Sequence, residues 1–151
     1  MQQRLPSLLA NPIAFAHRGA RADARENTIH AFELALEFGA TGLESDVWVT
    51  ADGEVVLDHD GVVGRVKKRK ITELRRSELP GHIPTLGELI LACGTDYDLS
   101  LDLKDSRSGV AVIDLLERTA PELAPRTWLC HPDIDVVGAL RPRSSVIRLV
   151  N

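Results

Sequence analysis

Glu44 and Asp46 are separated by one residue in the segment 42–49, whose composition is typical of a β-strand. Because side chains alternate between the faces of a strand, both carboxylates share a face with Trp48, about 7 Å apart. A solvated strand edge is one explanation, since Asp and Glu are mostly exposed in proteins. The strand otherwise has the pattern of one buried on both faces, where two carboxylates repel unless a cation joins them. We therefore favour a metal site.

A second strand repeats this pattern at 97–104, where leucines alternate with polar residues. In a barrel the leucines would face the outer helices, and Asp102 and Lys104 would face the interior near the strand's C-terminal end, where barrel enzymes place catalytic groups. Asp102 is then a candidate third oxygen ligand. The alternative is an internal pair between Asp102 and Lys104 with no ligand.

His17 and His59 each follow a short apolar run, at the strand ends where α/β sheets bind ligands. Taken singly, each is compatible with a structural histidine. Beside a metal site they supply two groups that titrate near neutral pH, as general acid–base catalysis requires. The other histidines are weaker candidates: His30, His82 and His131.

The spacing of apolar residues predicts the elements that position these groups. Strands are expected at 13–17, 42–49, 55–57, 97–103, 127–130 and 146–150, and helices at 28–38, 85–93, 110–117 and 134–140. This alternation indicates parallel βαβ units, in an α/β barrel or a doubly wound sheet. Neither a Gly-rich dinucleotide fingerprint nor a P-loop follows any strand, which weakens a nucleotide-binding function.

Composition is typical of one globular domain over residues 1–151, with 44% hydrophobic residues and a formal net charge of −4. The acidic balance argues against a nucleic-acid partner, and the basic run 67–70 is interpreted as a solvated loop. Cys93 and Cys130 are expected to be reduced, buried and without a disulfide, which favours the cytoplasm. No apolar stretch approaches the roughly 20 residues that span a bilayer, so stable membrane insertion is not expected.

A longer series of residues resembles the glycerophosphodiester phosphodiesterase family. It covers 13–104 densely and the remainder faintly, with more than a dozen positions in the correct order. The matching positions are His17-Arg18-Gly19, Glu26-Asn27-Thr28, Ala31-Phe32, Ala35, Gly39, Gly42, Glu44-x-Asp46-Val47, Thr50, Asp52-Gly53, His59-Asp60, Ile83-Pro84-Thr85-Leu86 and Leu101-Asp102-Leu103-Lys104.

The resemblance implies a TIM-type (β/α)8 barrel with a small excursion after the second strand, at about 61–84. His17 and His59 would be the acid and base, and Arg18 and Lys104 would contact phosphate. The metal ligands would be Glu44, Asp46 and Asp102. The family usually has glutamate at the position of Asp102; aspartate keeps the charge but shortens the reach by one methylene.

Length is the larger departure from the family. A TIM barrel takes about 250 residues, whereas this sequence has 151 and reaches only the fifth barrel strand. We expect a partial barrel, truncated after that strand, whose open edges favour self-association.

The expected function is metal-dependent hydrolysis of a small-molecule glycerophosphodiester to an alcohol and glycerol 3-phosphate. All-oxygen ligation favours Mg²⁺ or Ca²⁺. Two alternatives stay open, a non-catalytic metal-binding remnant and a lysophospholipase D-like activity. The nucleophile, water or the substrate's own 2-hydroxyl, also stays open.

Overall fold

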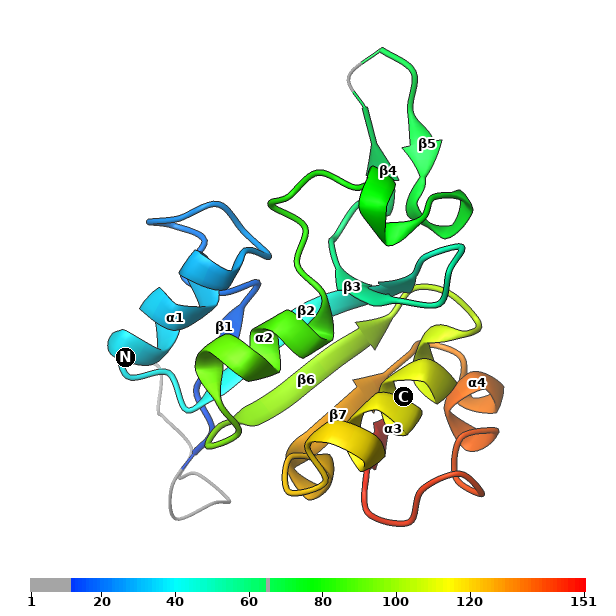
Figure 1. Cartoon of the computed structure of the whole chain (residues 1–151). Coiled ribbons are helices and arrows are strands. Elements are labelled where there is room, and N and C mark those ends of the chain that lie inside the picture. Colours follow the sequence, from blue (N-terminus) through cyan, green and yellow to red (C-terminus); the bar gives the residue numbers. More distant parts are fainter. Residues whose placement is uncertain (1–11, 65) are drawn as a thin grey trace, which may run out of the picture.

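The computed structural model describes residues 12–64 and 66–151, which form a six-stranded sheet and a separate two-stranded hairpin (Figure 1). Five strands of the large sheet are parallel, which confirms the five expected barrel strands. In spatial order they are β1 (Phe15–His17), β2 (Gly42–Val49), β6 (Asp98–Leu103), β7 (Thr127–Cys130) and β8 (Arg148–Val150). The sixth strand, β3 (Val55–Leu57), pairs with β2 in the antiparallel direction, so β1 and β8 are the edges of the parallel array.

Two helices each begin directly after a threonine whose hydroxyl caps the helix. Helix α1 (Ile29–Glu37) is capped by Thr28, whose hydroxyl accepts from the Ala31 amide. A capping box between Thr85 and Glu88 starts α2 (Leu86–Cys93). The other helices are α3 (Ser108–Thr119), the short α4 (Ile134–Gly138) and the 3-10 turn η3 (Ala124–Arg126).

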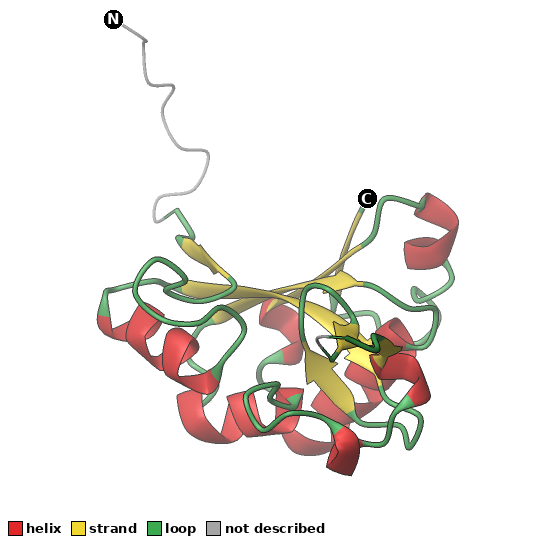
Figure 2. Ribbon diagram, turned by 90° about the horizontal axis from the view of Figure 1, so that it is seen from above, coloured by secondary structure: helices red, strands yellow, loops and turns green. Residues whose placement is uncertain are grey.

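The sheet curves into an open arc, and α1, α2 and α3 cover its convex side (Figure 2). The alternating leucines of β6 point to these helices, as expected. They join one hydrophobic core with residues of the neighbouring strands and helices, including Leu43, Leu99, Leu101, Leu129, Phe32, Leu86, Ile113 and Leu116.

The concave side of the arc carries the opposite set of side chains. The shared register of β2 and β6 places Asp46 beside Asp102 on this side. Phe15 of β1 and Trp128 of β7 also meet here, edge to face at 5.6 Å, and the Arg148 guanidinium stacks 4.1 Å from the Trp128 ring. The face that would line a barrel interior is therefore mixed, acidic near the ends of β2 and β6 and with an aromatic pair between β1 and β7.

The excursion after β3 has more structure than the sequence predicts. It contains β4 (Val62–Val63), β5 (Arg69–Lys70) and two 3-10 turns, η1 (Ile71–Glu73) and η2 (Arg76–Glu78). A second, smaller hydrophobic cluster holds it against the sheet: Val56, Ile71, Leu74, Leu79 and Ile83.

Two smaller expectations need correction. The basic run 67–70 is exposed, but its last two residues pair in β5 rather than forming a simple loop. Cys93 and Cys130 are free, as expected, yet both are only half-buried. Cys130 faces the concave side of the arc, beside Ser100. In the described part of the chain, we find no helix with the length and apolar character needed to cross a membrane.

Candidate active site

The loop after β1 brings Arg18 against β2 in an unusual backbone conformation. Arg18 has φ of +60°, the left-handed region that non-glycine residues rarely adopt. Its amide donates to the Glu44 carbonyl oxygen at 3.0 Å and to the Glu44 carboxylate at 3.1 Å. Gly19 follows with φ of +79°, and a Cβ there would lie 2.7 Å from the Ala31 backbone of α1. The loop is thus strained and tightly packed where it meets the acidic residues.

Three carboxylates form the centre of the site. One ligand atom each from Glu44, Asp46 and Asp102 lies within 4.8 Å of the others. Asp46 is 2% exposed, and its Oδ2 atom is buried without a hydrogen-bond partner among the described residues. A buried carboxylate oxygen without a donor is costly. The orphaned oxygen and the all-carboxylate donor set therefore fit a hard divalent cation.

Two cationic side chains flank this cluster. Lys104 Nζ lies 2.9 Å from Asp46 Oδ1 and 3.5 Å from Asp102 Oδ2, and Arg18 Nε lies 3.4 Å from Asp46 Oδ2 without hydrogen-bond geometry. Burial acts to lower the pKa of Lys104, but Asp46 and Asp102 outweigh it and raise that pKa. The internal Asp102–Lys104 pair thus exists, yet the shorter contact of Lys104 is with Asp46, on the neighbouring strand.

Glu44 and His17 meet at the edge of the cluster, where His17 Nε2 lies 3.7 Å from Glu44 Oε2. Burial and the charge of Asp46 raise the pKa of Glu44 to about 7, against the opposing effect of the Arg18 amide. Burial, Arg18 and Arg21 lower the pKa of His17. The lowered pKa favours the neutral form of His17, so its contact with Glu44 does not depend on an ion pair.

His59 lies at the C-terminal end of β3, outside the carboxylate cluster. Its Nδ1 is 2.9 Å from Asp60 Oδ1, which leaves Nε2 available to a ligand. The ring lines a small cavity of about 140 Å³ together with Glu26 and Asp58. Glu26 also pairs with Arg18 at 3.3 Å, so this cavity adjoins the cationic side of the carboxylate cluster.

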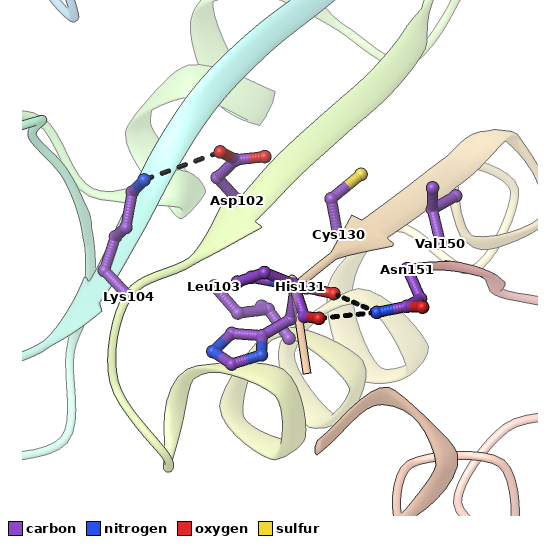
Figure 3. A pocket seen from close by; sticks show the side chains of 8 residues that line it. Asp102, Leu103, Lys104, Cys130, His131, Val150 and Asn151 are labelled. Carbon is purple, nitrogen blue, oxygen red and sulfur yellow. Dashed lines mark hydrogen bonds and ion pairs between the residues drawn. The ribbon is translucent and has the colours of Figure 1, made fainter. Parts of the chain in front are cut away.

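A larger cavity of about 430 Å³ opens on the other side, at the C-terminal ends of β6, β7 and β8 (Figure 3). Asp102 and Lys104 border it on the side of the cluster, and the dashed line between these two residues in Figure 3 marks their ion pair. The remaining lining residues include Cys130, His131, Val150 and Asn151. The carboxylate cluster and its cations thus lie between two cavities.

Sequence reasoning missed several residues that shape this site. Glu26 pairs with Arg18, and Asp60 orients His59. Both lie inside motifs that carry the family resemblance, Glu26-Asn27-Thr28 and His59-Asp60, so the sequence does hold a signal for them. Strand alternation predicts that Trp48 shares a face with Glu44 and Asp46, but it indicates no role for the indole. In the structure the indole N–H donates to the Asp58 carbonyl oxygen, in the loop that carries His59. This hydrogen bond joins residues ten positions apart, and no sequence pattern predicts it.

The fold and the site together define a class. A parallel βα array with carboxylates, histidines and cations at the C-terminal strand ends is part of a TIM barrel with an enzyme-type site. The family model described as the glycerophosphoryl diester phosphodiesterase family matches residues 17–112. The chain belongs to this family.

Relatives of known name agree with this assignment. The chain is 34% identical over 122 residues to a glycerophosphodiester phosphodiesterase of Caldanaerobacter subterraneus, a match that covers 70% of this chain and 49% of the relative. It is 38% identical to human glycerophosphodiester phosphodiesterase 1, in a match that covers 86% of this chain and 49% of the relative. The chain thus spans about half the length of these curated relatives.

Solved structures show the same fold. A glycerophosphodiester phosphodiesterase from Thermotoga maritima superposes with a TM-score of 0.77 at 28% identity, over 93% of this chain and 62% of that one. An Oleispira antarctica phosphodiesterase, solved in complex with its product sn-glycerol-3-phosphate, superposes with a TM-score of 0.79 at 24% identity, over 91% and 64%. Each of these structures extends well beyond the part that this chain covers.

Proposed function

We propose that this chain carries the catalytic half-site of a metal-dependent phosphodiesterase that hydrolyses a glycerophosphodiester to an alcohol and glycerol 3-phosphate. The observation that carries this proposal is the cluster of Glu44, Asp46 and Asp102 beside His17, in a chain of this family. The orphaned Asp46 oxygen supports a cation there, and oxygen-only ligands favour Mg²⁺ or Ca²⁺.

The charges of the site suit an anionic phosphodiester. Three carboxylates and one divalent cation sum to a single negative charge, and Arg18 and Lys104 turn that sum to a single positive one. A bound divalent cation would polarise the phosphoryl oxygens and neutralise charge that develops on them. Arg18 and Lys104 would then orient the phosphate by direct contact.

The two histidines divide the proton transfers. The lowered pKa of His17 favours its neutral form, which accepts the proton of the nucleophile. His59, with Nδ1 held by Asp60, presents Nε2 and donates a proton to the leaving alcohol oxygen. The nucleophile is either water or the 2-hydroxyl of the glycerol arm; the second route gives a cyclic phosphate that water then opens.

The test is the release of glycerol 3-phosphate from glycerophosphocholine in Mg²⁺ or Ca²⁺. His17→Ala and His59→Ala should each lower kcat by roughly 10²–10⁴-fold, the usual contribution of a positioned acid or base. His30→Ala is the matched control, because His30 is exposed on α1, and it should retain the parent rate. Rates near the parent value in both site variants would remove the histidines from the mechanism.

A second proposal concerns assembly. The edges β1 and β8 carry apolar side chains that are unusually exposed, with Phe15 at 40% and Val150 at 39%. Unpaired edges of this kind are templates for pairing with another chain. We propose that the isolated chain associates with itself through these strands.

A further inference from the structure

The loop that carries His59, residues 58–61, is attached to the site through Trp48. The indole lies on the same face of β2 as Glu44 and Asp46. Its Nε1 donates to the Asp58 carbonyl oxygen at 2.8 Å, which belongs to the peptide group immediately before His59. The Asp58 amide in turn donates to the Asp46 carbonyl oxygen at 3.1 Å. The backbone entering His59 is therefore tied to β2 at two points.

The far end of the same loop packs on the indole ring. Gly61 has φ of +67°, and a Cβ at this position would lie 2.3 Å from the Trp48 ring. No residue with a side chain fits between them without displacing the ring. The loop is closed by the Gly61 amide, which donates to the Asp58 carboxylate at 2.8 Å, and the Ile71 amide holds the Gly61 carbonyl oxygen at 2.9 Å. Trp48 thus contacts both ends of the turn that presents His59.

His59 has little else to hold it. Its side chain is 41% exposed, and its ring partner Asp60 is 74% exposed. An exposed pair of this kind contributes little ordering by itself. The placement of the imidazole relative to the carboxylates therefore depends on the loop backbone, and the loop backbone depends on the indole.

We propose that Trp48 is a positioning residue, whose indole holds the 58–61 loop so that His59 faces the carboxylate cluster. This inference rests on the proposed function, because it takes His59 as the group that serves the leaving alcohol. The competing explanation is that Trp48 only fills space, since it also packs against the small cluster of the excursion. The two explanations differ in what the N–H group does.

Trp48→Phe separates them, because it keeps an aromatic ring and removes the indole donor. A displacement of about 1 Å of a catalytic group can cost 10²-fold in rate. We expect kcat of Trp48→Phe to fall by about 10- to 100-fold with KM little changed, and the double variant with His59→Ala to be no slower than His59→Ala alone. Trp128→Phe is the matched control on the same face of the arc and should leave kcat unchanged. Gly61→Ala perturbs the same contact from the other side and should reproduce the loss.

A second readout does not depend on turnover. In the parent chain, glycerol 3-phosphate with Mg²⁺ should shift the NMR signals of both His17 and His59. In Trp48→Phe the His59 response should disappear while the His17 response persists. If Trp48 only fills space, Trp48→Phe should either weaken the His17 and His59 responses together or leave both unchanged. Each of these two results would overturn the inference.

The failures of the two proposals are distinguishable. If His59→Ala lowers kcat but Trp48→Phe behaves as the parent, the inference is wrong and the proposed function stands. If glycerol 3-phosphate with Mg²⁺ shifts neither histidine and His59→Ala leaves turnover unchanged, the proposed function fails and the inference fails with it.

Discussion

At the scale of single residues, the site is a balance between three carboxylates and the cations that approach them. Asp46 illustrates it, because one oxygen pairs with Lys104 while the other finds no hydrogen-bond donor among residues 12–64 and 66–151. Without a divalent ion, Lys104 and Arg18 supply the nearest positive charge, and Glu44 keeps a proton more readily than an ordinary glutamate. Under the proposed function, a divalent cation at this cluster would replace the proton of Glu44 and the ammonium contact of Asp46.

A metal ion should therefore stabilise the folded chain. Mg²⁺ or Ca²⁺ should raise the Tm, because a ligand that binds only the folded state stabilises it. Glu44→Gln combined with Asp46→Asn should abolish the rise, and Asp102→Glu should retain it. The matched control is Glu33→Gln with Glu37→Gln, on the exposed side of α1. The measurement is the Tm at increasing metal concentration. An equal rise of the Tm in the parent and in the Glu44/Asp46 variant would contradict the metal site.

Glu44 also predicts a pH dependence of stability in the metal-free chain. Its pKa is about 7 in the fold against an ordinary value of 4.5, so the folded state binds the proton more tightly than the unfolded state does. The free energy of unfolding should then fall as pH rises from about 4.5 to about 7, by about 3 kcal/mol for this group.

Urea unfolding in a chelator, at several pH values, measures this dependence. Glu44→Gln removes the titrating group but keeps the side-chain shape, so the difference between parent and variant isolates the contribution of Glu44. That difference should grow in favour of the variant as pH rises through this window. Parallel pH curves would mean that the carboxylate is not penalised in the fold.

At the scale of elements, the sequence predicts the parts of the site that come from a single regular element. Alternation along β2 and β6 correctly places Glu44, Asp46 and Asp102 on one face, because the two-residue period of a strand is local. The capping residues Thr28 and Thr85 fix the starts of α1 and α2 for the same reason.

Features that depend on two distant segments were not predictable from such patterns. The contact of Lys104 with Asp46 depends on the register between β2 and β6. The hairpin and small core of the excursion come from packing of short, weakly periodic segments. The left-handed backbone of Arg18 has no sequence signal either. Its contacts with Glu44 and Asp46, which are distant in the sequence, offset the strain of that conformation.

Gly19 lies where the loop after β1 packs closely against the backbone of α1. Gly19→Ala should be destabilising twice over, by about 1–2 kcal/mol for the left-handed backbone and by about 1–3 kcal/mol for overlap with the Ala31 backbone. Gly39→Ala is the matched control, because Gly39 has φ of +89° but no atom within 4 Å of an added Cβ. Chemical unfolding should show a larger loss for Gly19→Ala, and equal losses would mean that the close approach to α1 carries no cost.

At the scale of the whole molecule, residues 12–64 and 66–151 form an arc of a barrel. Helices cover the convex side of this arc, and its concave side is left open. The parallel array has two edges, β1 and β8. Parallel sheets in proteins are normally covered on both faces, and the solved relatives extend beyond the part that this chain matches. The candidate metal ligands Glu44, Asp46 and Asp102 lie on the neighbouring strands β2 and β6, so the carboxylate cluster forms within the arc.

This geometry leads to the prediction about self-association. Light scattering should give a mean mass that rises with concentration, and hydrogen exchange should be fast in β1 and β8 at low concentration and slower when the chain associates. Val150→Lys places a charge on the exposed edge strand and should shift the equilibrium toward the monomer, because lysine on an edge opposes strand pairing. Leu91→Lys is the matched control, since Leu91 is 88% exposed but lies on helix α2 and not on an edge strand. A monomer at every concentration, with both edge strands fully protected, would contradict the prediction and would mean that the described elements satisfy these edges by themselves.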